Sequence, residues 1–168
     1  MHKNQRGIVL VISLIMLLVM TLIGVSAMNA SMVAEKMAGN SRDVELAFQA
    51  AETGLRYGET WIANQIAEPE AKANGSSQVW TLEGIGTGIT TKNQAWWMTN
   101  AVAYTSAISN VKTAPRIVIE YTAFVPDDLL VGSGNGSEGL TYYRVTSRGT
   151  GGSDQSRVLL QSTTARRF

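Results

Sequence analysis

The sequence predicts an α+β protein in which one long N-terminal helix, apolar in its first half and amphipathic in its second, packs on an antiparallel β-sheet. Three observations lead to this fold class. The chain carries an uncharged apolar run from Ile8 to Val25, and a helical pattern without proline then continues to Ile66. After Pro69 the chain changes to short runs rich in β-branched and aromatic residues, separated by glycine-rich turns.

The apolar run is long enough to cross a membrane. At about 1.5 Å per residue, Ile8 to Val25 spans roughly 27 Å as a helix, close to the thickness of a hydrocarbon core. Lys3 and Arg6 precede the run, so the positive-inside rule places the N-terminus in the cytoplasm and the bulk of the chain outside. A cleaved secretory signal is the alternative, but its apolar core has only about 7–15 residues.

The second half of the predicted helix is amphipathic. Apolar residues and a glycine recur at steps of three and four and predict a packing stripe, while charged residues largely occupy the other faces. The stripe consists of Phe48, Ala51, Leu55, Gly58, Ile62 and Ile66. We expect the rest of the domain to cover this stripe. Gly39-Asn40 is a point where the helix could bend.

The C-terminal hundred residues predict the sheet. The strand-like segments are 77–82, 101–109, 116–125, 140–148 and 156–164. The residues between the last two, Gly149 to Asp154, are typical of a hairpin connection. The domain organisation is therefore 1–7 basic leader, 8–28 transmembrane helix, 29–67 amphipathic continuation and 68–168 β-rich head.

Composition argues against several classes of function. The 14 Lys and Arg nearly balance the 13 Asp and Glu, so no nucleic-acid partner is expected. The chain has no cysteine, which excludes disulfides and thiol nucleophiles, and its one histidine is His2 in the basic tail. No catalytic site can be assembled, because Asp154 with Ser153 or Ser156 lacks a histidine for a hydrolase triad. We expect neither an enzyme nor a bound cofactor or metal.

Two features of the head are candidates for contact with a partner. Trp96 and Trp97 could stack against a partner's side chain, although such a pair is more often one core residue beside a partly exposed neighbour. Asp127 and Asp128 open a loop that also holds Asn135 and Glu138, which could offer oxygens to calcium. Their spacing matches no EF-hand, and a solvated loop is favoured.

Three segments of the sequence resemble type IV pilins, and most closely the PilX-type minor pilins of Gram-negative bacteria. They are RGIVLVISLIMLLVMTLIGVSAM, EKMAGNSRDVELAFQAAETGLR and, near the C-terminus, YYRVTSRGTGGSDQSRVLLQS. The N-terminal match covers about residues 6–56, and the middle of the chain, about 61–112, is not covered. The resemblance implies a pilin-like fold, with the apolar part of the helix serving first as a membrane anchor and then as filament core.

The resemblance also implies a processing site and a set of partners. Prepilin peptidase would cut between Gly7 and Ile8 and methylate the new amino group at Ile8. The subunit would wait in the inner membrane with its head in the periplasm and then enter a pilus. Minor pilins of this type join other minor pilins and the major pilin in a priming complex, with an adhesin-like partner at the tip. That complex supports assembly, twitching motility and surface attachment.

One position departs from the pilin pattern in an informative way. Most pilins carry glutamate at the fifth mature position, thought to pair with the amino terminus of a neighbouring subunit, and here that position is Ile12. A lone charge in an apolar bundle is costly, so a subunit without this glutamate cannot neutralise a neighbour's terminus. A first or tip subunit fits this absence, with a low-copy subunit placed anywhere in the fibre as the alternative.

Two other interpretations compete with the pilus subunit. A minor pseudopilin of type II secretion also lacks the glutamate in its tip subunit, but that family typically carries a large helical insertion in the head. From a different class, the chain could be a membrane-anchored periplasmic enzyme or ligand-binding module. The head has no convergent catalytic side chains, which argues against the enzyme.

Overall fold

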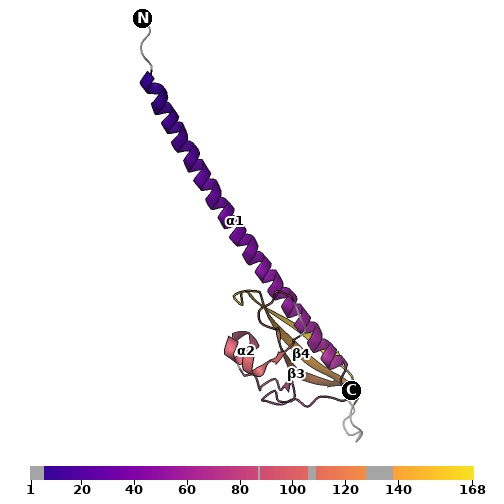
Figure 1. Cartoon of the computed structure of the whole chain (residues 1–168). Helices are drawn as coiled ribbons and strands as arrows, with labels where there is room; N and C mark the ends of the chain where they lie inside the picture. Colours follow the sequence, from indigo (N-terminus) through magenta and orange to yellow (C-terminus); the bar gives the residue numbers. More distant parts are fainter. Residues whose placement is uncertain (1–5, 87, 106–108, 128–137) are drawn as a thin grey trace. The chain divides into compact units, whose positions relative to one another are not determined.

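The computed structural model describes residues 6–86, 88–105, 109–127 and 138–168. Its elements are α1 (Arg6–Ala63), β1 (Val79–Trp80), a 3-10 turn (Ile89–Thr91), α2 (Gln94–Asn100), β2 (Val102–Ala103), β3 (Arg116–Pro126), β4 (Gly139–Thr150) and β5 (Arg157–Arg166) (Figure 1). The long helix and the β-rich C-terminal part confirm the predicted α+β class. The chain divides into two compact units, residues 1–41 and 42–168.

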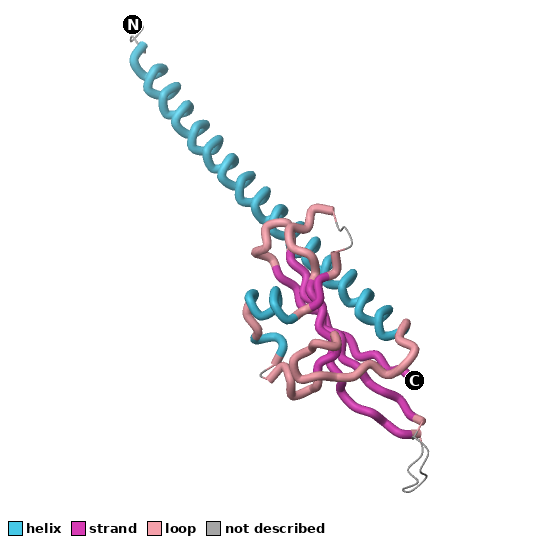
Figure 2. The backbone as a smooth tube through the Cα atoms, turned by 60° about the horizontal axis from the view of Figure 1, so that its bottom comes forward, coloured by secondary structure: helices cyan, strands magenta, loops and turns pink. Residues whose placement is uncertain are grey.

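The head is built around one five-stranded sheet with the order β1-β3-β4-β5, in which β2 also pairs with β3. The two long pairings, β3 with β4 and β4 with β5, are antiparallel as predicted. β1 runs parallel to β3, so the sheet is mixed rather than wholly antiparallel. Figure 2 shows the three long strands side by side, with the shorter elements beside them.

The strand bounds differ from the sequence prediction mainly at the first two strands. β1 and β2 are two residues long each, because each pairs with only two positions of β3. Part of the predicted strand 101–109 lies outside the described residues. β4 extends to Thr150, so the hairpin connection starts two residues later than predicted, at Gly151.

A second helix, α2, was not predicted. Asn93 caps it, since its side-chain oxygen accepts a hydrogen bond from the backbone N–H of Trp96 at 2.9 Å. The expectation of a single helix was wrong because seven residues are too few for a periodic pattern to be recognised. Figures 1 and 2 show α2 on the side of the sheet opposite the last part of α1.

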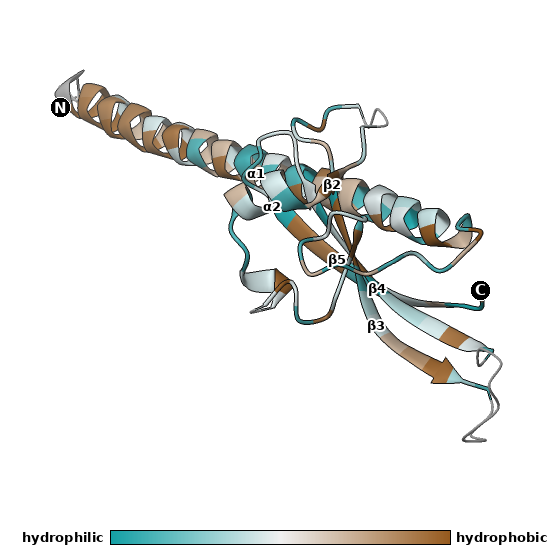
Figure 3. Ribbon diagram, turned by 90° about the horizontal axis from the view of Figure 1, so that it is seen from below, coloured by the Kyte–Doolittle hydropathy of each residue, from teal (hydrophilic) through white to brown (hydrophobic). Residues whose placement is uncertain are grey.

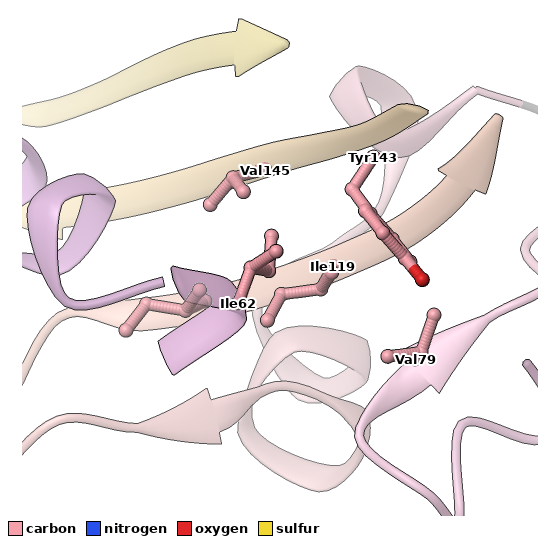
Figure 4. Packing of buried hydrophobic residues seen from close by; sticks show 6 residues of the cluster. Ile62, Val79, Ile119, Tyr143 and Val145 are labelled. Atoms are coloured by element: carbon pink, nitrogen blue, oxygen red, sulfur yellow. The ribbon is translucent and has the colours of Figure 1, made fainter. Parts of the chain in front are cut away.

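Both faces of β3 are buried, and this gives the head two hydrophobic clusters. Ile117 and Ile119 point to the face that packs on α1, where Ile62, Val79, Tyr143 and Val145 complete the first cluster (Figure 4). Val118 points to the opposite face, and its cluster contains Trp80, Ile85, Ile89, Trp97 and Ala101. Side chains alternate along a strand, so a strand buried on both faces has a continuous apolar run, as Ile117 to Ile119 has.

The predicted packing stripe on α1 was only partly correct. Phe48 and Ile66 are exposed, and the side of α1 that is buried in the head carries mostly small residues: Ala47, Ala50, Ala51, Gly54, Gly58 and Ile62. The reason is the close approach of the sheet. A Cβ added at Gly58 would lie 2.5 Å from Cγ1 of Val145, and one added at Gly149 would lie 2.1 Å from the carbonyl oxygen of Ala47.

The helix also ends earlier than predicted. α1 stops at Ala63, and Ile66 is fully exposed at 100% of its accessible surface. The last carbonyl oxygens of a helix lack an N–H donor within the helix. The guanidinium of Arg166 donates to one of them, the carbonyl oxygen of Ile62. A contact from the last strand therefore replaces the last predicted turn.

Candidate functional site

The first part of α1 is apolar on every side and exposed along its length (Figure 3). It is long and apolar enough to cross a membrane, and none of its most apolar stretch is buried against the rest of the chain. The two polar side chains within the run from Ile8 to Val25 are satisfied locally. Ser13 donates to the carbonyl oxygen of Leu10 at 2.9 Å, and Thr21 donates to that of Leu18 at 2.7 Å. The segment can therefore enter lipid or a bundle of apolar helices without leaving a hydroxyl unpaired.

The predicted processing site lies at the start of this helix. Gly7 and Ile8 both fall within the first turns of α1, and the side chain of Ile8 is exposed. Ile12 follows one turn later and is 53% exposed, with no acidic residue before Glu35 in the sequence. The apolar segment therefore presents no carboxylate to a neighbouring molecule.

The tryptophan pair divides into a core residue and a surface residue. Trp97 is 1% exposed and belongs to the second hydrophobic cluster, whereas Trp96 is half-buried. Trp96 packs edge-on against Trp97 and tilted against Trp80, with ring centroids 5.7 Å apart in both cases. The Nζ of Lys92 lies 5.4 Å from the centroid of the Trp96 ring. The expectation of a core residue beside a partly exposed neighbour is confirmed, so only Trp96 has surface left for a partner.

The carboxylate of Asp127 forms an ion pair within the chain. It receives both terminal nitrogens of Arg167, one of them at 3.0 Å, and this ion pair ties the C-terminus to the end of β3. The other predicted contact, Asp128, lies outside the described residues, as does Asn135. Within the described part of the chain, no three acidic or histidine side chains come together as metal ligands would.

A third acidic residue, which sequence reasoning did not single out, fixes the β4–β5 hairpin on the helix. Asp43 of α1 accepts hydrogen bonds from the backbone N–H of Ser153 at 3.2 Å and from its hydroxyl at 2.6 Å. Hydrogen bonds from the Ser153 and Ser156 side chains hold the pKa of Asp43 at about 2. Gly151 lies directly against this carboxylate. In a chain without cysteine, this polar clamp holds the last hairpin to the helix.

One shallow hollow of about 390 Å³ opens where the chain leaves α1. Its lining is mostly apolar but includes two carboxylates, and it is formed by Glu68, Pro69, Glu70, Ala71, Thr81 and Tyr121. Both carboxylates already have partners: Glu68 accepts from the Thr141 hydroxyl at 3.2 Å, and Glu70 pairs with Lys72 at 3.1 Å. The hollow carries no arrangement of groups suited to catalysis.

Comparison with known protein families identifies the family of this chain. The model of the PilX N-terminal region matches residues 6–56, and the model described as type IV pilus assembly protein PilX C-term matches residues 50–166. The chain belongs to the PilX family. No curated protein and no solved structure gave a significant match.

Membership of the PilX family makes the chain a type IV pilus minor pilin. PilX pilins are structural subunits that assemble with other pilus components, and the single apolar helix of this one suits membrane anchoring followed by entry into the pilus. The C-terminal match also includes the middle of the chain, which the resemblance seen in the sequence did not cover. This region contains α2 and Trp97, which cover the second face of the sheet.

Proposed function

We propose that this PilX-family chain is processed between Gly7 and Ile8, held in the inner membrane with its N-terminus in the cytoplasm, and then built into the priming complex at the pilus tip. The observation that carries the proposal is the apolar part of α1, whose large side chains are all exposed. Such a segment moves from lipid into a bundle of similar helices with little change in solvation.

The tip position rests on Ile12. A shaft subunit must neutralise the amino terminus of the subunit next to it, because an unpaired charge in an apolar bundle is costly. This chain presents no carboxylate in its apolar segment and therefore suits a position where no such terminus has to be paired. We propose that other minor pilins, the major pilin and a tip adhesin are its neighbours, and that assembly, twitching motility and attachment depend on it.

Mass spectrometry of the protein from sheared surface fibres tests the processing step. The expected mature N-terminus is an N-methylated Ile8. A protein that starts at Met28 or Ser31 would contradict the proposal, because the apolar segment would then have been discarded.

A deletion strain should lose surface pili and twitching but keep type II secretion. The opposite outcome would favour the pseudopilin alternative.

The substitution Ile12→Glu tests the tip position. With a carboxylate at this position the subunit can pair with a neighbour's terminus, so immunogold labelling should spread from the fibre end along the shaft. Ile15→Glu serves as the matched control, because it adds the same charge one turn further along the helix. Labelling that stays at one end in the Ile12→Glu strain would argue that head contacts alone fix the position.

A further inference from the structure

β5 is an edge strand without the usual protection against pairing. It pairs with β4 at ten consecutive positions without a bulge, from Thr150↔Arg157 to Thr141↔Arg166, and no described residue pairs with its other edge. Proteins commonly protect such an edge with a bulge, a proline, a lysine or a short strand. The β5 sequence, RVLLQSTTAR, contains no proline, lysine or acidic residue. A full row of backbone N–H and C=O groups is thus open to an added strand.

The face of β5 turned away from α1 is also free. Every second residue of the strand is exposed, and these side chains are Arg157, Leu159, Gln161, Thr163 and Ala165. The segment that contains α2 covers Val118 of β3 on this face of the sheet but leaves the β5 residues uncovered. The open edge and the open face of β5 together form one continuous surface.

Arginines without a carboxylate partner surround this surface. Arg116 and Arg148 lie directly opposite each other in the β3–β4 ladder, and Arg157 follows on the same face of β5, diagonal to Arg148. The ion pairs of the described residues include none of these three. Arg148 has only the Gln94 side-chain oxygen at 3.4 Å and the Trp97 ring at 5.9 Å. Burial lowers the pKa of Arg148, the charge of Arg157 lowers it further, and the charge of Asp154 opposes both effects.

Nearby carboxyl groups offset this positive charge only in part. Glu120 stands opposite Arg144 in the ladder, but it is 5% exposed and one of its oxygens has no hydrogen-bond partner. Burial raises the pKa of Glu120, and the charge of Arg144 opposes that rise. Asp154 is already paired with Lys112 at 3.4 Å. An incoming group that suits this part of the sheet carries negative charge.

The positive charge of this surface favours an acidic segment of a partner protein over a second copy of this chain. A second copy that added its own β5 would bring its arginines but no carboxylate to this surface, because RVLLQSTTAR contains no acidic residue. We propose that β5 binds an extended acidic segment of a partner protein by strand addition, with a carboxylate of the segment beside Arg157. Backbone hydrogen bonds supply affinity, and the arginines select for acidic sequences.

This inference rests on the proposed function for the identity of the partner as a pilus component, but its test does not require pili. The full chain in detergent micelles is mixed with a fluorescent ten-residue peptide in which Glu alternates with Thr, or with the same peptide carrying Lys for Glu. We expect the acidic peptide alone to bind and to slow hydrogen exchange at residues 157–166. Equal binding of both peptides, or protection elsewhere than β5, would overturn the proposal.

Substitutions separate the charge contribution from the backbone contribution. Arg157→Glu should weaken binding of the acidic peptide by about tenfold or more. Arg56→Glu is the matched control, because Arg56 lies on α1 in an ion pair with Glu52, and binding should stay unchanged. Concentration-dependent protection of β5 without peptide would show that a second copy occupies the edge and would overturn the proposal.

A pair of proline variants tests strand addition itself. Successive amides of an edge strand point alternately to the neighbouring strand and to the free edge, so one of Gln161 and Ser162 donates outward. Of Gln161→Pro and Ser162→Pro, the variant that keeps its thermal stability is the one whose amide faced outward. We expect that variant to lose at least about tenfold in peptide affinity. If it binds as well as the unchanged chain, the segment does not add as a strand.

Discussion

The part of α1 before residue 41 and the part after it differ in whether the head buries their side chains. Before residue 41 its large apolar side chains are exposed, and a Cβ added at Gly24 or Gly39 would meet nothing within 4 Å. After residue 42 its buried side is made mainly of alanine and glycine, and a Cβ added at Gly54 would lie 2.4 Å from Oγ of Ser147. The side chains of the first part therefore suit surroundings outside this chain, whereas those of the second part suit close packing on its own sheet.

The largest loss of stability is expected from Gly149→Ala. The new Cβ would lie 2.1 Å from the carbonyl oxygen of Ala47 and 2.3 Å from the amide nitrogen of Ala51, and neither backbone atom can turn aside as a side chain could. We expect a loss of more than about 3 kcal/mol in the free energy of unfolding. Denaturant titration of the full chain in micelles, followed by tryptophan fluorescence, measures it. Stability within about 1 kcal/mol of the unchanged chain would mean that α1 does not lie this close to β4.

Ile62→Ala tests the cluster on the α1 side of the sheet. Ile62 is 1% exposed and packs with Ile119, Tyr143 and Val145 (Figure 4), so its truncation leaves a cavity. We expect a loss of about 2–4 kcal/mol. Ile66→Ala is the matched control, since this exposed isoleucine should cost little when truncated. Equal losses for the two variants would contradict the early end of the helix.

Asp43 should make the stability of the head depend on pH in acid. Its pKa in the folded chain is about 2, below the usual 3.8, so the charged carboxylate favours the folded state. The stabilisation is complete above about pH 4 and is lost as the pH falls toward about 2. Comparison of chemical denaturation at pH 5 and pH 2.5 should show a smaller pH effect for Asp43→Asn than for the unchanged chain.

A matched variant controls for general acid effects in that experiment. Glu45→Gln removes a carboxylate two residues further along α1, where it accepts a long 3.4 Å hydrogen bond from Gln49. It should leave the pH dependence almost as it was. An unchanged acid response in Asp43→Asn would show that the hairpin loop does not depend on this clamp.

The smallest effect is expected from Gly39→Ala. No atom lies within 4 Å of the added methyl group, and alanine favours the helix over glycine by about 1 kcal/mol. Circular dichroism of the full chain should show equal or slightly higher helicity, with the stability of the head unchanged. A marked loss of helicity would indicate that the helix needs the flexibility of glycine at this point.

The sequence predicted the elements that are long and periodic. The apolar run, the helix and the antiparallel character of the long pairings followed from patterns that extend over many residues. The size of tryptophan predicted that one of Trp96 and Trp97 is a core residue, but not which one. Prediction failed where the decisive contact is with a distant residue. The stripe on α1 was wrong at Phe48 because the closeness of the sheet, and not hydrophobicity, selects the buried residues.

The residues of the candidate sites also divide into those that the sequence reveals and those that only the tertiary structure reveals. Gly7, Ile8 and Ile12 could be singled out from the sequence because the roles proposed for them depend on their place in a linear pattern. Asp43 and the arginines beside β5 could not, since their partners or their lack of partners emerge only when strands far apart in the sequence are paired. Asp127 was singled out as a partner contact, but its carboxylate is engaged by Arg167, forty residues later.

The sequence by itself determined that this protein has an apolar helix able to leave water and a β-rich head to follow it. Those properties depend on hydrophobicity and local periodicity, which are written into neighbouring residues. Only the tertiary structure decided which side of the helix is buried, where the helix ends and which edge of the sheet stays open. Those properties depend on backbone approach and on charges brought together across the ladder, which no local pattern encodes.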